Sequence, residues 1–279
     1  MSLLSDISRF IRNNSPFTKP ELWSELPGSL VRNFEMRLAK NHKVHEVRIA
    51  GNTKVRADTA TSIGHALYIY KSWEYPITRL FKTLLQPTTV FLDIGANIGY
   101  FSVLAATKCN YVFAFEPVRA VFTELQANVA LNGFENVEMH CVAVSDRNGD
   151  LPFYVVESRN NGLSSLAGFS GGSEIIVPSV RLDSFLRGRP SPKVDLIKID
   201  VEGAEERVIE GALELLSPHV APDIIFERHP SSSSDRLLKE LGYQIFGLRH
   251  QRSYEATNLF ATKRGPSPAT ARLLEPWAK

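Results

Sequence analysis

The sequence predicts an α/β protein built around an open, doubly wound, Rossmann-like sheet, and two observations support this. From Thr88 onward, short apolar runs of strand length alternate with helical patterns. The first run, "TVFLDI", is almost continuously apolar and passes directly into a glycine-rich turn. A strand buried on both faces of a parallel sheet has this character, and its connection to the next parallel strand is a right-handed crossover.

The remaining strands are predicted in chain order. The runs "YVFAFE", "NVEMHCVAVS", "VDLIKID" and "PDIIFE" are expected as the second to fifth strands, and "YQIFGL" and "ATNLFAT" as later ones. A helix should follow Gly99, and a second should have Pro117 in its first turn and end near Leu131, where Asn132-Gly133 closes it.

A third helix is predicted from "AEERVIEGALELL", residues 204–216. Its apolar stripe comprises Val208, Ile209, Ala212, Leu213 and Leu216. The acidic residues of the same segment are expected on a solvated face without a function; they are Glu205, Glu206, Glu210 and Glu214.

Two regions interrupt the alternation of strands and helices. Residues 1–85 predict an N-terminal α/β extension with a helical start, a hairpin at "VHEVRIAGNTKVRAD" and an aromatic segment. A second hairpin, "GDLPFYVV" with "EIIVPSV", is inserted before the fourth strand, and its polar loop has the length of a functional or disordered segment. The core is therefore expected over residues 86–265, followed by a tail at 266–279.

Composition restricts the partners. The net charge of +2 comes without a basic block, so nucleic acid is not the expected partner. No apolar run approaches the roughly 20 residues of a membrane span, and the N-terminus lacks a secretory signal pattern. Cys109 and Cys141 are expected as buried thiols in a reducing compartment, which favours the cytoplasm.

Two aromatic or apolar groups near the N-terminus are assigned to packing. Leu3, Leu4, Ile7, Phe10 and Ile11 have helical spacing, and docking on a partner or membrane is the less favoured alternative. Tyr68, Tyr70, Trp73 and Tyr75 fit a packing interface better than a wall that stacks on a sugar, and partial exposure would allow a homo-oligomer.

The glycine-rich turn has the pattern D-x-G-A-N-x-G, formed by Asp93, Gly95, Ala96, Asn97 and Gly99. The spacing is wrong for the dinucleotide motif G-x-G-x-x-G, and no Gly-Lys-Ser/Thr of a P-loop follows. An acid beside the turn suits a cation better than a pyrophosphate. The expected ligand is S-adenosylmethionine, which carries an ammonium, a sulfonium and a ribose without a phosphate.

Two further segments are assigned to this cofactor. Glu116 ends the second strand, where a carboxylate can accept hydrogen bonds from both ribose hydroxyls. Val144, Ser145 and Asp146 leave the third strand where an adenine edge would be read, although Asp146 fits a turn residue equally well.

Longer motifs carry a resemblance to a known family. "FLDIGANIGYFSVLAA", "VFAFEPVRAVFTELQANVALNG", "VAVSDRNGDLPFYV", "RLDSFL", "DLIKIDVEGAEERVIEGA" and "IIFERHP" follow in the order seen in the FkbM family of S-adenosylmethionine-dependent methyltransferases. The resemblance covers about residues 70–262. It implies a class I methyltransferase fold and O-methylation, mostly of sugar hydroxyls on glycans, glycolipids or glycosylated natural products, and also of polyketides.

The candidate catalytic residues follow the fourth and fifth strands: Asp200, Glu202, Glu227 and His229. Histidine has the unperturbed pKa, about 6.5, that suits a base at neutral pH. The three carboxylates could instead bind a divalent cation, but base catalysis is preferred and no metal ligand is assigned. Asp200 is also counted among the cofactor residues.

Three other functions remain open at this point. A binding module could retain the glycine turn and bind S-adenosylmethionine without turnover, although the motifs "KIDVEG" and "FERHP" argue against it. A nucleic-acid methyltransferase should have Asn/Asp-Pro-Pro-aromatic where this chain has Asp200-Val201-Glu202-Gly203. An NAD-dependent sugar oxidoreductase is disfavoured by the spacing of the turn.

Overall fold

The computed structural model describes residues 43–155, 173–189, 193–219, 221–229, 232–249 and 257–277. The chain divides into two compact units, Met1–Tyr75 and Pro76–Lys279. The boundary predicted after residue 85 would leave α4 (Tyr75–Leu84) outside the second unit. That placement is wrong, because Phe81 of α4 packs edge-on against Phe91 in the centre of the main sheet, with ring centroids 4.8 Å apart. The apolar N-terminal segment from Leu3 to Ile11 lies outside the described residues.

The described part of the first unit is the predicted hairpin followed by a helix. Strands β1 (Val44–Ala50) and β2 (Thr53–Asp58) pair antiparallel. Helix α3 (Ser62–Tyr70) begins at Thr61, whose hydroxyl accepts a hydrogen bond from the Gly64 N–H, as an N-cap does. The Tyr68 ring lies 4.3 Å from the His45 ring, so this aromatic packs within its own unit.

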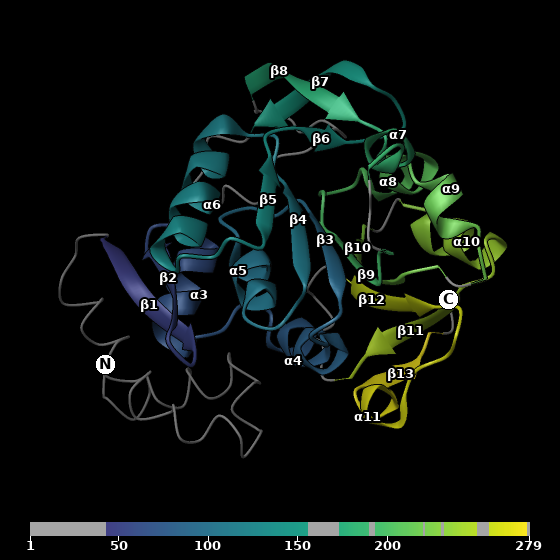
Figure 1. Ribbon diagram of the computed structural model, residues 1–279, viewed down its shortest axis with the longest axis horizontal. Coiled ribbons are helices and arrows are strands. Elements are labelled where there is room, and N and C mark those ends of the chain that lie inside the picture. The colour runs from purple at the N-terminus through teal and green to yellow at the C-terminus, as the bar shows by residue number, and fades with distance from the viewer. Residues whose placement is uncertain are drawn as a thin grey trace, which may run out of the picture. The chain divides into compact units, whose positions relative to one another are not determined.

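The second unit is built on one large sheet with strands in the order β13-β11-β12-β10-β9-β3-β4-β5 (Figure 1). Its parallel part contains β5 (Val137–His140), β4 (Tyr111–Phe115), β3 (Val90–Ile94), β9 (Leu196–Ile199) and β10 (Asp223–Arg228). Three antiparallel pairings then add β12 (Thr257–Thr262), β11 (Gln244–Leu248) and β13 (Leu274–Pro276). The doubly wound α/β sheet predicted from the sequence is present.

The C-terminal segment belongs to this sheet. After α11 (Pro268–Ala271), β13 pairs with β11. The prediction that residues 266–279 form a tail is therefore wrong for the described residues up to 277. A three-residue strand that pairs only along one side gives too short a pattern to identify in the sequence.

Helices cover both faces of the sheet (Figure 1). One face packs against α8 (Glu205–Glu210), α9 (Leu213–Leu216) and α10 (Ser234–Glu240), which contribute Val208, Leu216 and Leu238 to the apolar core. On the other face, α5 (Tyr100–Ala106) places Phe101 edge-on to Phe81, and α6 (Arg119–Leu131) follows β4. Each fully buried Leu, Ile or Phe contributes about 1.5–3 kcal/mol.

The boundaries of α6 lie close to the predicted ones. Pro117 precedes the N-cap residue Val118 and so lies just outside the first turn of the helix. The helix ends at Leu131 as predicted, and Gly133 after it is left-handed.

The run predicted as a single third strand forms two strands in two different sheets. β5 ends at His140, whose carbonyl accepts the Glu116 N–H beside the end of β4. The chain then enters β6 (Ala143–Val144), which pairs with β8 (Ser173–Val180). β8 also forms the predicted hairpin with β7 (Gly149–Val155). A continuous run of strand-forming residues does not indicate that the pairing partner changes within it.

The helix predicted over residues 204–216 is interrupted at Gly211. A Cβ on Gly211 would lie 2.0 Å from the Ser145 carbonyl oxygen, so the close approach of another backbone bends the chain here. Leu213 was predicted in the apolar stripe, but it is 43% exposed, so this part of the prediction is wrong.

The short helix α7 (Leu182–Leu186) explains the motif "RLDSFL". Asp183 is buried, and its two carboxylate oxygens accept the N–H groups of Glu214 and Leu215, each at 3.1 Å. It thereby satisfies the first turn of α9 from a neighbouring helix, which is a capping function.

Candidate functional site

The glycine-rich turn connects β3 to α5 in a conformation that depends on left-handed residues. Gly95, Asn97 and Gly99 have φ of 77°, 52° and 85°. The N–H groups of Gly95 and Ala96 both donate to the Phe115 carbonyl, at 3.1 and 2.9 Å. The turn is therefore fixed against the end of β4. This is the strand end where Glu116 was predicted to bind the cofactor.

The backbone that follows β9 approaches Gly95 so closely that this position requires a glycine. A Cβ at this position would lie 1.8 Å from the carbonyl oxygen of Asp200. A larger side chain at Gly95 would therefore displace the turn after β9. The same contact brings the glycine turn next to the candidate catalytic aspartate.

Asn128, a residue that the sequence analysis did not select, supports the turn from α6. Its side chain is completely buried and donates to the Ile98 carbonyl at 2.7 Å. A polar residue on the buried face of a predicted amphipathic helix was the available signal.

Glu116 lies at the end of β4 and is tied to the turn. One carboxylate oxygen accepts the Asn97 N–H at 3.1 Å, and the other accepts the Val118 N–H at 2.9 Å. Burial raises the pKa of Glu116 to about 7, although these two hydrogen bonds favour the charged form. Each carboxylate oxygen has a second lone pair, so this group suits the ribose diol for which it was predicted.

Asp93 occupies a different position from the one expected. It is completely buried, and its Oδ2 accepts the Ser102 hydroxyl of α5 at 2.5 Å. Burial raises its pKa, whereas the neighbouring Lys198 acts in the opposite direction. An inaccessible carboxylate does not suit direct contact with a ligand, so its assignment to the cofactor ammonium does not match this environment.

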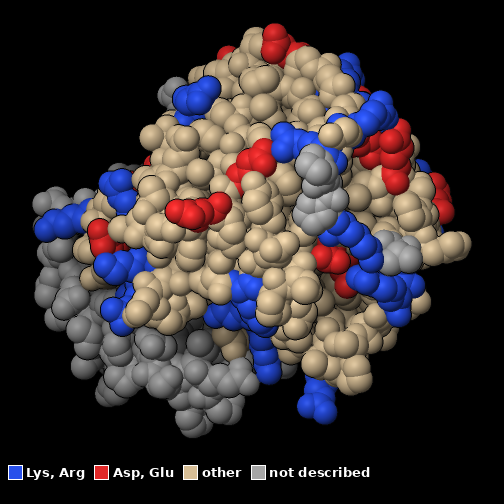
Figure 2. Space-filling view, viewed as in Figure 1, with Lys and Arg blue, Asp and Glu red and all other residues tan. Residues whose placement is uncertain are grey.

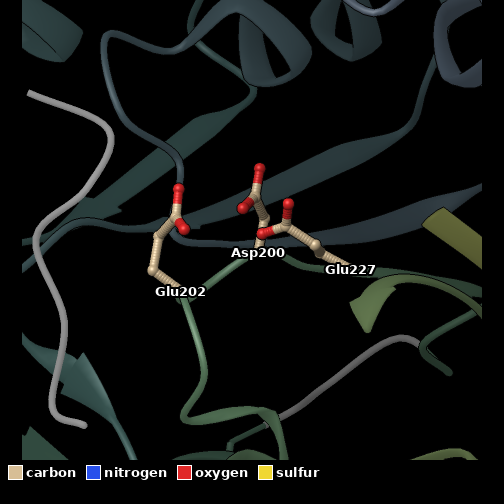
Figure 3. Close-up of side chains that lie close together, drawn as sticks. All are labelled: Asp200, Glu202 and Glu227. Atoms are coloured by element: carbon tan, nitrogen blue, oxygen red, sulfur yellow. The ribbon is translucent and has the colours of Figure 1, made fainter. Parts of the chain in front are cut away.

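Three of the four predicted catalytic residues converge, and we call them the carboxylate cluster: Asp200, Glu202 and Glu227 (Figure 3). One oxygen from each lies within 4.8 Å of the others. Asp200 follows β9, Glu202 lies in the next turn and Glu227 is near the end of β10. Carboxylate oxygens this close to one another could hold a metal ion.

The turn that carries Glu202 is stabilised by a hydrogen bond to the Glu205 side chain. Glu202 and Gly203 both have left-handed backbones, with φ of 52° and 96°. The Glu205 side chain is completely buried and accepts the Gly203 N–H at 2.8 Å. The prediction of a solvated Glu205 is therefore wrong, because this carboxylate folds back onto the turn at the start of α8. Burial raises its pKa.

His229 and the predicted adenine-side residues are not members of the carboxylate cluster. His229 is exposed, one residue beyond the end of β10. Ser145 is completely buried, and its N–H donates to the Val180 carbonyl. Val144 is buried in the main core, and Asp146 accepts a hydrogen bond from the Ser145 hydroxyl at 2.9 Å and pairs with Arg147. The residues that reach Glu116 from the end of β5 are His140 and Cys141.

The polar loop of the inserted hairpin, residues 156–172, lies outside the described residues. Basic and acidic side chains are interspersed over the face of the molecule in Figure 2, in keeping with the small net charge. Among the described helices, none combines the length and apolarity needed to cross a bilayer.

The sheet, the glycine-rich turn and the carboxylate cluster are typical of a methyltransferase domain. Comparison with known proteins identifies the family. The Methyltransferase FkbM domain matches residues 93–246, which is more than half of the chain. The chain therefore belongs to the FkbM family of S-adenosylmethionine-dependent methyltransferases.

Individual relatives share a moderate identity with this chain. Hexuronic acid methyltransferase AglP of Haloferax volcanii is 28% identical over 143 residues, which cover 51% of this chain and 58% of that protein. 31-O-demethyl-FK506 methyltransferase FkbM of Streptomyces tacrolimicus is 30% identical over 176 residues, covering 52% and 67%. A crystal structure of an FkbM methyltransferase from Methylobacillus flagellatus is 20% identical, with a TM-score of 0.47 over 84% of this chain and 60% of that one.

Proposed function

We propose that this methyltransferase transfers a methyl group to a hydroxyl group of a sugar. The observation that carries the proposal is the carboxylate cluster, which lies directly beside the cofactor turn through the contact of Gly95 with Asp200. The name of AglP, a hexuronic acid methyltransferase, supports a sugar acceptor. The name of the Streptomyces tacrolimicus enzyme makes a hydroxyl of another natural product the second choice.

Bound S-adenosylmethionine supplies the methyl group on a positively charged sulfur. The cofactor site would be shaped by Gly95, Ala96, Asn97 and Gly99, and Glu116 would accept hydrogen bonds from the ribose hydroxyls. The chain's task at the reacting atoms is to align the acceptor oxygen and to accept its proton. Asp200 and Glu227 come from adjacent strands, so either one can accept a hydrogen bond from a hydroxyl held between them.

The destination of the proton distinguishes two versions of this mechanism. In the preferred one, a carboxylate of the cluster or the exposed His229 acts as the base, which typically contributes about 10²–10⁴-fold. In the other, Asp200, Glu202 and Glu227 hold a divalent cation that polarises the hydroxyl. The second version is supported by the mutual proximity of the three carboxylates.

The experiment is an acceptor series with purified protein. Methyl glycosides of hexuronic acids and of neutral sugars, together with a macrolide bearing a free hydroxyl, are incubated with S-adenosylmethionine, and products are detected by mass. The most rapidly methylated compound then serves to compare Asp200→Ala and Glu227→Ala with the wild type. Glu240→Ala, in which an exposed carboxylate is removed, is the matched control.

We expect kcat to fall at least tenfold in both cluster variants, with cofactor affinity within about threefold of wild type, because the lost interaction acts mainly in the transition state. Inactivation by EDTA and recovery with Mg²⁺ would select the cation version. Wild-type kcat in Asp200→Ala, Glu227→Ala and His229→Ala alike would exclude both versions.

The compartment is also proposed. Cys109 and Cys141 are both free thiols, and Cys109 is buried. Free thiols of this kind are typical of a reducing compartment, which supports the cytoplasm.

A further inference from the structure

A buried lysine connects the strand of the cofactor turn with the carboxylate cluster. Lys198 lies in β9, directly opposite Asp93 of β3 in the parallel register. It is only 4% exposed, and its Nζ lies 4.9 Å from the centre of the Phe101 ring. The same Nζ donates to Oδ2 of Asp200 at 2.7 Å. The motif "DLIKID" displayed this lysine within a buried apolar strand, but no function had been assigned to it.

Lys198 has two acidic neighbours, Asp200 and Asp93. Asp93 is completely buried, and Ser102 donates to its Oδ2. The other oxygen, Oδ1, has no hydrogen-bond partner among the described residues. A buried ammonium and a buried carboxylate are each costly alone and tolerable together. Lys198 opposes the rise that burial causes in the pKa of Asp93, so each group lowers the cost of burying the other.

We propose that Lys198 is a positioning residue that fixes the orientation of the Asp200 carboxylate, with Asp93 holding Lys198 in place. The proposal rests on the proposed function of Asp200. A carboxylate with one oxygen bonded to a buried, immobile ammonium cannot rotate freely, so the direction of its other oxygen is also set. Without Lys198, Asp200 would be free to turn toward solvent, since its side chain is already 27% exposed.

The positive charge has a second consequence for the carboxylate cluster. Three carboxylates lie within 4.8 Å, and Lys198 is bonded to one of them. An adjacent ammonium offsets part of their mutual repulsion and so helps to hold Glu202 and Glu227 close to Asp200. Both consequences act on the geometry of the acceptor side, and neither requires that Lys198 touch a substrate.

The test must separate positioning from a loss of folding. Lys198→Met removes the charge and retains a long apolar stem, but it leaves Asp93 buried without a counter-charge. The double variant Lys198→Met/Asp93→Asn removes both charges and retains the hydrogen bond from Ser102. Each variant is measured for thermal unfolding, for S-adenosylmethionine affinity by calorimetry, and for kcat with the best acceptor of the series above.

We expect the double variant to melt within about 3 °C of wild type and to bind S-adenosylmethionine within threefold, while kcat remains at least tenfold lower. Adding Asp200→Ala to it should cause no further loss relative to Asp200→Ala alone, because Lys198 acts through Asp200. Wild-type kcat in the double variant would overturn the proposal and leave Lys198 with a purely structural role.

A crystal structure of the double variant tests orientation without any acceptor. The Asp200 carboxylate should adopt a different side-chain torsion, and an unchanged torsion would overturn the positioning role. If Asp200→Ala itself retains wild-type kcat, the proposed function of Asp200 fails, whereas the torsion still decides whether Lys198 orients this side chain. The two failures are therefore distinguishable.

Discussion

Replacing Glu116 with glutamine should change the pH dependence of stability in a predictable direction. The carboxyl has an ordinary pKa of 4.5 and a pKa of about 7 when buried at the end of β4. Between these values the folded state binds more protons than the unfolded state, so the contribution of Glu116 to stability falls as the pH rises. At 1.36 kcal/mol per pKa unit the total loss is about 3 kcal/mol, most of it between pH 5 and pH 8.

The amide introduced by Glu116→Gln would have no charge to bury, so the cofactor-free variant should not lose this stability. Near pH 5 the two proteins should have similar free energies of unfolding, because a protonated carboxyl and an amide each fail to accept one of the two backbone N–H groups. At pH 8 the variant should be more stable than wild type by about 3 kcal/mol. Urea unfolding at a series of pH values measures the difference, with Glu240→Gln as an exposed control.

Cofactor binding should respond in the opposite way. The ribose hydroxyls require an ionised acceptor, so wild-type affinity should fall about tenfold per pH unit below pH 7. The variant should bind about ten- to hundredfold more weakly at pH 8, because charge-assisted hydrogen bonds are lost, and its affinity should not depend on this titration. Parallel stability curves for the two proteins, or a flat wild-type affinity from pH 6 to pH 8, would refute the reasoning.

Other predictions concern the packing around the site. Asp183→Ala should lower the free energy of unfolding by about 1–3 kcal/mol, since the N–H groups of Glu214 and Leu215 lose their acceptor; unchanged urea unfolding would contradict this. Gly211→Ala should destabilise the domain by more than Gly247→Ala, because the first places a Cβ 2.0 Å from a backbone oxygen and the second places it 3.3 Å from the flexible Glu275 side chain; equal melting temperatures would contradict this. Gly95→Ala should both weaken cofactor binding and lower kcat, because the added Cβ forces the glycine-rich turn away from Asp200. A variant that loses only cofactor affinity, or only kcat, would show that the cofactor turn and Asp200 are not coupled.

The strands of the main sheet could be predicted because each is a short, nearly continuous apolar run. Their order could not, because it depends on contacts between distant segments. The run from Asn136 to Ser145 shows the limit: its residues favour strand throughout, yet β5 pairs with β4 and β6 pairs with β8. Likewise, the helical pattern over residues 204–216 contains no sign that the Ser145 carbonyl would approach Gly211.

In the candidate site, too, some features could be predicted from the sequence and others could not. The proximity of Asp200 and Glu227 follows from parallel strands whose ends meet at one edge, so it was accessible to sequence reasoning. The burial of Asp93 and Glu205 was not, because a carboxylate in a motif has the same letter whether it faces a ligand, the solvent or a neighbouring backbone. Lys198 was visible as a charge within an apolar strand, but its partner depended on the register of β9 against β3.

The position of β12 between β10 and β11 has a consequence for synthesis on the ribosome. β11 emerges first, but its place in the sheet is separated from β10 by a strand that has not yet been made. Until residues 257–262 leave the exit tunnel, the apolar strand β10 presents unpaired backbone groups to other nascent chains. Any delay between the emergence of β10 and the emergence of residues 257–262 would prolong this exposure and should lower the yield of folded protein.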